Sequence, residues 1–261
     1  MKQKICIANP SGNITVLVSS PVKRIEYARV AQRLMTKIDG AEQVGFFADP
    51  CFGGDVRLEM MGGEFCGNAM RSAALYYAGK QTLSGESLVR TEISGCDHPL
   101  SVFVDPESGT ARGEFPLPIK AEWGRFSEKP AFTVWFEGIV HYVFPGGIPE
   151  LSSESLKEKL RAVTETERVS AAGLMVLEVS SLRMTPVVYV RDTDTLVYES
   201  SCASGSAAAA VYLSAGKETC RETYLLKEPG GSLAASVTKE NGRIEKLEIG
   251  GTITFSSEIE I

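Results

Sequence analysis

Runs of β-branched and aromatic residues alternate along the chain with two kinds of helix-like segment. Residues 22–35 and 156–163 place apolar side chains at the spacing of one helix face, which predicts amphipathic helices. The stretches that follow Cys66 and Cys202 are rich in alanine, which also favours helices. We expect strands at the β-branched and aromatic runs, which are residues 102–104, 133–136, 186–190, 196–198 and 252–255.

The residues between these segments predict where the elements end. Segments 49–55 and 192–194 carry the Gly, Pro or Asp typical of turns, and we interpret Asp192 and Asp194 as a solvated turn. Gly79 and Gly216 stand where the C-terminal caps of the two alanine-rich helices would fall.

Two parts of the chain match each other at one constant offset. Residues 62–76 (GGEFCGNAMRSAALY) align with residues 198–212 (YESSCASGSAAAAVY), so that Cys66 falls on Cys202. The same offset places Glu92 on Glu228, and a slightly shifted one places Asn13 over His141. Internal repeats of this kind indicate a duplicated unit.

The repeat predicts an α+β fold of two pseudo-symmetric lobes, each a sheet wrapped around a central helix. The N-terminal lobe would span residues 1–118 and the C-terminal lobe residues 119–249, with a join near 116–120 where two prolines discourage regular structure. Residues 250–261 would return as a final strand to the first lobe. We expect the active site in the cleft between the lobes.

Composition excludes several classes of protein. With 261 residues, 43% of them hydrophobic, the chain can bury a core, and a net charge of −6 disfavours nucleic-acid binding. No apolar run is long enough for a signal peptide or a membrane span, so we expect a cytoplasmic protein that makes no membrane contact. Six cysteines without a Cys-x-x-Cys pair, and two histidines, predict neither a disulfide scaffold nor a metal site.

Cys66 and Cys202 each stand where a turn becomes a helix. Unpaired N–H groups and the helix dipole at such a position stabilise an anion, which predicts a lowered thiol pKa and a place for a substrate carboxylate. Small residues beside the sulfurs (Gly67, Ala203 and Gly205) let a ligand approach the backbone. Two such thiols suit a two-base racemase, in which one removes a proton from a carbon and the other returns one to the opposite face. The remaining cysteines, which have no such setting, are predicted to be inert: Cys6, Cys51, Cys96 and Cys220.

Four motifs carry a resemblance to a known family: Asn9–Asn13 (NPSGN), Phe65–Ala69 (FCGNA), Val140–Val143 (VHYV) and Ser201–Gly205 (SCASG). They resemble those of the cofactor-independent amino-acid racemases and epimerases with the diaminopimelate epimerase fold, although Ala203 replaces an expected glycine. Within that family the chain is most similar to the histidine racemases of staphylopine-like metallophore biosynthesis. Residues 42–46, 94–96, 199–202 and 229–232 add to this similarity.

The resemblance implies a small amino-acid substrate, most simply histidine, and neither a cofactor nor a metal; a homodimer is compatible with it. It implies that Cys66 and Cys202 are catalytic and that Glu199 and His141 assist them. The residues it implies for substrate binding are Asn13, Glu42, Gly67, Asn68, Ala203, Ser204 and Gly205. Without it, His141 would be interpreted as a core histidine, and Asn13 and Asn68 as turn residues.

Three alternatives remain at this point: a diaminopimelate epimerase, a non-racemising isomerase or binding relative, and a thiol-redox protein. Diaminopimelate epimerases carry an arginine after the glutamate that leads to the second cysteine, and this arginine binds the distal carboxylate of the substrate. Here Ser200 follows Glu199, which argues against a substrate with a second carboxylate. Glu42, by contrast, can accept an N–H from an imidazole.

Overall fold

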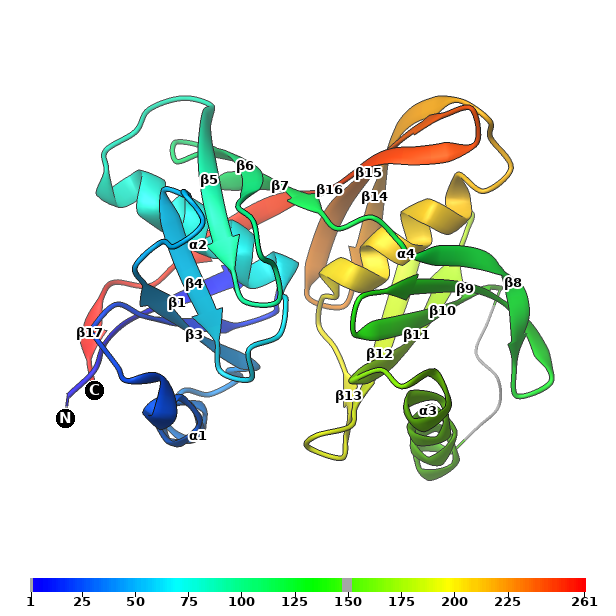
Figure 1. The fold of residues 1–261 in the computed structure, drawn as a ribbon, viewed down its shortest axis with the longest axis horizontal. Coiled ribbons are helices and arrows are strands. Elements are labelled where there is room, and N and C mark those ends of the chain that lie inside the picture. Colours follow the sequence, from blue (N-terminus) through cyan, green and yellow to red (C-terminus); the bar gives the residue numbers. More distant parts are fainter. Residues whose placement is uncertain (1, 147–151) are drawn as a thin grey trace. The chain divides into compact units, whose positions relative to one another are not determined.

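The computed structural model describes residues 2–146 and 152–261, and the chain folds as two compact units. The first unit consists of Met1–Glu114 together with Gly250–Ile261, and the second of Phe115–Ile249. Both units mix strands with a few helices, so the fold is α+β (Figure 1).

The first unit begins and ends with strands that pair with each other. Its elements are β1 (Lys4–Pro10), β2 (Thr15–Val18), the short 3-10 helix η1 (Arg24–Glu26), α1 (Tyr27–Lys37), β3 (Gln43–Ala48), β4 (Val56–Met60), α2 (Gly67–Lys80), β5 (Ser87–Ile93), β6 (Leu100–Asp105), β7 (Thr110–Phe115), the end of β16 (Arg243–Phe255) and β17 (Ile259–Glu260). β1 pairs antiparallel with both β16 and β17. The strands at the two ends of the chain are therefore neighbours in one sheet.

Helix α2 is the centre of the first unit. It contacts β1, β2, β4, β5 and β6, and its residues from Gly67 to Leu75 are all buried. A helix that is buried all round needs small side chains so that strands can approach it on every side, which explains its alanine content. Helix α1 is amphipathic and instead covers β3, where Tyr27 stacks on Phe46 with ring centroids 3.9 Å apart.

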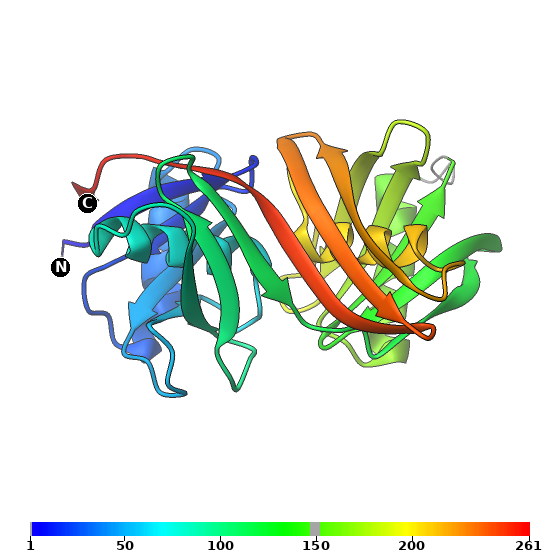
Figure 2. The same cartoon turned by 90° about the horizontal axis from the view of Figure 1, so that it is seen from above.

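The second unit repeats this plan. Its elements are β8 (Lys120–Phe126), β9 (Lys129–Phe136), β10 (Ile139–Pro145), α3 (Ser153–Glu167), β11 (Ala171–Glu178), β12 (Arg183–Val190), β13 (Thr195–Tyr198), α4 (Ala203–Leu213), β14 (Cys220–Glu228), β15 (Gly231–Glu240) and the greater part of β16. The buried helix α4 contacts β9, β10, β11, β14 and β15, whereas α3 packs on β11, β12 and β13. Figure 2 shows β14 and β15 as long strands side by side, in agreement with their antiparallel register.

Strand pairing follows the same order in both units. A parallel pair comes first (β2–β3 and β10–β11), then an antiparallel one (β3–β4 and β11–β12). After the buried helix, another parallel pair (β4–β5 and β12–β14) is followed by an antiparallel one (β5–β6 and β14–β15). The sequence repeat thus corresponds to a repeated topology.

Most predicted elements are confirmed. The amphipathic segments form η1 with α1, and α3, and the five predicted strands lie within β6, β9, β12, β13 and β16. Residues 116–119 are irregular, as the two prolines predict. The 192–194 turn is confirmed as well, and Asp194 there also forms ion pairs with Lys157 and Arg161 of α3.

The predicted glycine caps are wrong. Gly79 lies within the last turn of α2, which is capped by Gln81, and Gly216 lies beyond Ser214, which caps α4. Both helices end with the N–H of the cap residue bonded to carbonyls of the last turn. After Gln81 the left-handed position is occupied by Thr82 (φ 53°) and not by a glycine.

No helix among residues 2–146 and 152–261 combines the length and the apolar character required to cross a membrane.

Enlarging a side chain inside α4 tests how closely the strands enclose that helix. Ala209 of α4 is fully buried, so Ala209→Leu should lower the free energy of unfolding by about 1–3 kcal/mol through overpacking. Ala162→Leu makes the same change on the exposed face of α3 and should stay within about 0.5 kcal/mol of the wild type. Urea unfolding of the two variants measures the difference, and equal stabilities would contradict this description of α4.

Candidate active site

Cys66 is the N-terminal cap of α2. Its backbone is extended (φ −138°, ψ 111°), and its sulfur accepts a hydrogen bond from the backbone N–H of Ala69 at 3.5 Å. The first turn of the helix therefore fixes the position of this thiol. Gly67 and Asn68, both buried, form the start of that turn.

An amide network surrounds Cys66. The Asn13 side chain lies between β1 and β2, and its carbonyl oxygen accepts from the Gln43 amide at 2.6 Å and from the Asn68 amide at 3.2 Å. The Asn13 amide in turn donates to the carboxylate of Glu42. The Gln43 side chain also forms a hydrogen bond to the Cys66 sulfur, and this bond lowers the pKa of the thiol. The structure thus brings Asn13, Glu42 and Asn68 together beside one sulfur.

A buried cation lies behind this network. Arg71 of α2 is fully buried and donates to the Asn68 side-chain oxygen at 2.8 Å. It also donates to the carbonyls of Ala111 and Gly251, at 3.2 and 3.3 Å. Its guanidinium orients Asn68, whose amide group then points to Asn13.

Cys202 caps α4 in the same way as Cys66 caps α2. Its backbone angles are close to those of Cys66 (φ −125°, ψ 105°), and its sulfur accepts the N–H of Gly205 at 3.3 Å. A Cβ at Gly205 would lie 2.2 Å from the Met175 sulfur and 3.2 Å from the Cys202 sulfur, so a larger residue there would require Met175 to move. The duplicated sequence motif therefore builds a duplicated cap.

His141 reaches Cys202 through a serine. Its Nε2 lies 2.9 Å from the Ser204 hydroxyl, which lies 3.5 Å from the Cys202 sulfur. The ring is fully buried in β10, and its Nδ1 has no hydrogen-bond partner among the described residues. Gly173 faces it from β11, where a Cβ would meet Nδ1 at 2.3 Å. Burial lowers the pKa of His141 to about 3, so the imidazole is neutral at physiological pH.

Two carboxylates lie at the Cys202 end of α4. The buried Glu228 of β14 accepts the backbone N–H of Cys202 at 2.6 Å and the hydroxyl hydrogen of Ser206. Glu199 follows β13, and its side chain bonds to the Cys202 thiol. Glu199, Ser204, Gly205 and Ala203 thus all lie at the start of one helix, beside Cys202.

The lowered thiol pKa values expected from the helix termini are wrong for both cysteines. Burial raises the pKa of Cys66 to about 11, against the opposing effects of the Ala69 N–H and of Gln43. Burial also raises the pKa of Cys202, and the charges of Glu199 and Glu228 raise it further. Loss of hydration outweighs the helix N–H groups because α2 and α4 are enclosed by strands.

Three residues near the sulfurs escaped the sequence analysis: Gln43, Arg71 and Glu228. Arg71 gave a local signal, since it is a charged residue inside a helix of small side chains. Glu228 matched Glu92 in the repeat, yet nothing in the sequence showed that its strand end reaches Cys202. Gln43 had no signal apart from its position next to Glu42.

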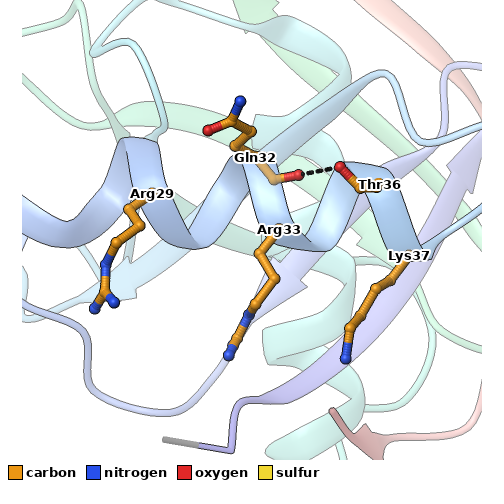
Figure 3. Close-up of a pocket in the computed structure, with 5 residues that line it drawn as sticks. All are labelled: Arg29, Gln32, Arg33, Thr36 and Lys37. Atoms are coloured by element: carbon orange, nitrogen blue, oxygen red, sulfur yellow. Dashed lines mark hydrogen bonds between the residues drawn. The ribbon is translucent and has the colours of Figure 1, made fainter.

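All six cysteines are free thiols. Cys96 packs against the core of the first unit, and the exposed Cys51 lies 2.7 Å from Arg57. Among residues 2–146 and 152–261, no three His, Cys, Asp or Glu side chains are grouped as metal ligands would be. A shallow hollow along the surface of α1 contains none of the predicted site residues (Figure 3); it is lined by Arg29, Gln32, Arg33, Thr36 and Lys37.

Comparison with solved structures shows a common fold. A PhzF-family phenazine biosynthesis protein from Bacillus anthracis superimposes with a TM-score of 0.70 at 11% identity, over 100% of this chain and 99% of that one. A hydroxyproline epimerase from Agrobacterium vitis, with bound trans-4-hydroxy-L-proline, gives a TM-score of 0.66 at 11% identity, over 100% and 92%.

Sequence comparison is more specific. A histidine racemase from Fusobacterium nucleatum is 33% identical, over 97% of this chain and 94% of the relative. A histidine racemase from Staphylococcus aureus is 28% identical, over 94% of this chain and 92% of the relative. The family model described as the histidine racemase CntK N-terminal domain matches residues 4–260. This chain therefore belongs to the CntK histidine racemase family.

Proposed function

We propose that this protein racemises histidine without a cofactor and that Cys66 and Cys202 are its two bases. The observation that carries the proposal is the repeated cap: in each half of the chain a cysteine sulfur accepts the N–H three residues on, at the start of a buried helix. Histidine racemases are the relatives that match nearly the whole chain, which supports the substrate.

The proposed reaction moves two protons and keeps their number constant. One cysteine, as thiolate, takes the proton of the substrate α-carbon and becomes a thiol. The other cysteine, as thiol, gives its proton to the opposite face of the same carbon and becomes a thiolate. This scheme requires the two sulfurs to reach one carbon, with the two units as pseudo-symmetric lobes around a shared cleft. The repeated strand order supports the description of the two units as similar lobes.

Ionisation of a buried thiol needs compensation. Both thiols have raised pKa values, so the unliganded protein holds them mainly as neutral groups. The α-ammonium group of a bound amino acid brings a positive charge next to the sulfur and favours the thiolate. Substrate binding would therefore produce the base where and when it is needed.

The first turns of α2 and α4 provide the groups that would hold the amino acid. The backbone N–H groups of these turns, at Gly67, Asn68, Ala203 and Ser204, suit the substrate carboxylate and the negative charge that develops on it. The amide groups of Asn13 and Asn68, which bond to each other, lie on the Cys66 side. We assign Gly205 a steric role, since a larger residue there would require Met175 to move.

Glu42 is proposed to select histidine. Its carboxylate is half-buried and held by the Asn13 amide, within the network that surrounds Cys66. A carboxylate in this place accepts an N–H of an imidazole or balances its positive charge.

His141 and Ser204 are proposed to relay a hydrogen-bond change to Cys202. If the neutral imidazole donates from Nε2 to the serine oxygen, the serine hydroxyl is free to donate to the Cys202 thiolate. If Nε2 accepts from serine, the serine oxygen can accept from the Cys202 thiol. The same pair thus serves both protonation states of the sulfur, and Glu199 offers a further acceptor for the thiol proton.

Reduced thiols are a requirement of this chemistry. We therefore propose that the protein acts in the cytoplasm, where thiols stay reduced. A homodimer would be compatible with this mechanism, because each chain carries both cysteines.

Removal of either sulfur tests the two-base scheme. L-Histidine in deuterated water without added cofactor should lose optical rotation and gain α-deuterium. Cys66→Ser and Cys202→Ser should each reduce racemisation at least about 100-fold, because a hydroxyl is a far weaker acid than a thiol. Cys96→Ser and Cys220→Ser are matched controls and should keep near wild-type rates. Full two-way activity in Cys202→Ser would disprove the scheme, and exchange of diaminopimelate in place of histidine would reassign the substrate.

Removal of the Glu42 charge tests substrate selection. Glu42→Gln should raise KM for histidine about 10- to 100-fold, the effect of losing one hydrogen bond to a charged group. The exposed Glu86 serves as a control, since Glu86→Gln makes the same change outside the site. An unchanged KM in Glu42→Gln would remove this residue from the site.

The buried neutral imidazole predicts a pH dependence of stability. The unfolded chain takes up a proton at His141 below pH ~6.5, while the folded chain does so only near pH 3, so stability falls as the pH drops between these values. At pH 5 the loss should be about 2 kcal/mol, and His141→Gln should lack it. His98→Gln, which alters an exposed ring, should keep it. Urea unfolding at pH 7 and pH 5 measures the effect, and equal pH slopes for the wild type and His141→Gln would refute it.

A further inference from the structure

The two cysteine caps are alike in backbone, but the charges buried around them have opposite sign. At Cys202, the Glu228 carboxylate is buried and accepts the backbone N–H of the cysteine itself at 2.6 Å. The Ser206 hydroxyl one turn later donates to the same carboxylate. A fixed negative charge is therefore held against the first turn of α4.

The residue equivalent to Glu228 in the first unit does not play this part. Glu92 of β5 is fully buried, but its carboxylate accepts the backbone N–H groups of Cys51, Phe52 and Gly54 and pairs with Arg57 at 3.0 Å. These partners lower the pKa of Glu92 to about 2 and engage its charge in the 51–54 loop. The start of α2 thus lacks the carboxylate that the repeat would place there.

A cation stands near Cys66 instead. Arg71 lies five residues after Cys66, about 7.5 Å along the axis of α2. It is fully buried, and it donates hydrogen bonds to oxygens of Asn68, Ala111 and Gly251. The position in α4 that matches Arg71 in the repeat is Ala207, which carries no charge.

We propose that Glu228 and Arg71 are positioning residues that make the two thiols unequal, so that Cys202 keeps its proton as the acid of the resting enzyme and Cys66 is the sulfur that ionises first. This inference rests on the proposed two-base function. A buried charge influences a thiol several ångströms away because water and salt screen buried charges only weakly. A negative charge beside a thiol opposes its ionisation, and a positive charge favours it.

The other charged groups near the sulfurs leave this order in place. Glu64 acts against the ionisation of Cys66, but its effect is smaller than those of the hydrogen bonds from Ala69 and Gln43, which favour the thiolate. Glu42 is hydrogen-bonded to the Asn13 amide and is not among the groups that shift the pKa of Cys66. Near Cys202, Glu199 raises the pKa of the thiol as Glu228 does, and His141 carries no charge. Lys239 binds the Ser214 carbonyl at the opposite end of α4, about 16 Å from its start.

The asymmetry gives the reaction cycle a direction. In the substrate complex Cys66 is the thiol that has released its proton to solvent; its thiolate takes the α-proton, and the Cys202 thiol donates to the opposite face. Turnover leaves a Cys66 thiol and a Cys202 thiolate. This state is less stable than the reverse one, because Cys202 binds its proton more firmly than Cys66. The enzyme returns to rest when Cys202 regains a proton from solvent, or it converts a molecule of the other enantiomer directly from this state.

Titration of the individual thiols tests the proposal without any substrate. Thiolate ultraviolet absorbance is followed against pH in Cys202→Ser, which retains Cys66, and in Cys66→Ser, which retains Cys202. The double variant supplies the background of the other cysteines and the tyrosines. Cys66 should ionise at the lower pH. Added to Cys66→Ser, Glu228→Gln should lower the midpoint of Cys202 by about one pH unit or more, since glutamine keeps an acceptor but loses the charge.

Controls separate the charge from its structural role. Glu222→Gln changes the same strand about 20 Å away and should leave the Cys202 midpoint unaltered. Added to Cys202→Ser, Arg71→Met should raise the Cys66 midpoint by about one unit, and Arg71→Lys should restore it. Near-ultraviolet circular dichroism verifies the fold of each variant.

The proposal is overturned if Cys202 ionises at or below the midpoint of Cys66, or if Glu228→Gln leaves the Cys202 midpoint unchanged in a folded protein. Because no substrate is present, these results are independent of the histidine assays. A protein inactive toward histidine with the predicted midpoints would disprove the proposed function alone.

Discussion

A sulfur atom that accepts the third N–H of a buried helix is the constraint on which both halves of this protein depend. The bond fixes each thiol relative to a rigid backbone, and it leaves the neighbouring N–H groups available for an anion. It also requires the helix to be enclosed, because an exposed helix end would bind water in place of a substrate. Small residues along α2 and α4 follow from this requirement, since strands must approach the helices from several sides.

Enclosure has a chemical consequence that the helix termini do not cancel. A thiol without water around it holds its proton more firmly, and both cysteines have raised pKa values. The polar groups around them are therefore part of the chemistry. Amides bond around Cys66, whereas a buried carboxylate bonds to the backbone N–H of Cys202, so the two halves share the backbone of the cap but differ in its electrostatics.

The sequence was sufficient for the elements and for the two caps, because both depend on local patterns. Alternating apolar residues, alanine-rich runs and the small residues after each cysteine predict helices and strands that the structure contains. Cys66 and Cys202 were identified by their repeat and their motifs. Asn13, Glu42 and Asn68 were chosen from family resemblance, and the structure places them in one network.

What the sequence did not predict depends on contacts between distant segments. The sign of the thiol pKa shift follows from burial by strands far away in the chain, which no local pattern reveals. Glu228 reaches Cys202 from the end of β14, and Gln43 reaches Cys66 from the start of β3. The glycine caps failed for a different reason: α2 is followed by a left-handed threonine, Thr82, where glycine was expected, and α4 ends with hydrogen bonds that any residue can make.

The pairing of β1 with β16 and β17 bears on how the polypeptide is made. Ala8 lies opposite Phe255, and Lys4 lies opposite Glu260, so the first strand to leave the ribosome has partners among residues 253–260. At ~5–20 residues per second those partners emerge on the order of tens of seconds later. Residues 115–249 are continuous and can fold in the meantime, whereas the first unit keeps an open sheet edge until translation has passed residue 260. Biosynthesis therefore favours completion of the second half before the first.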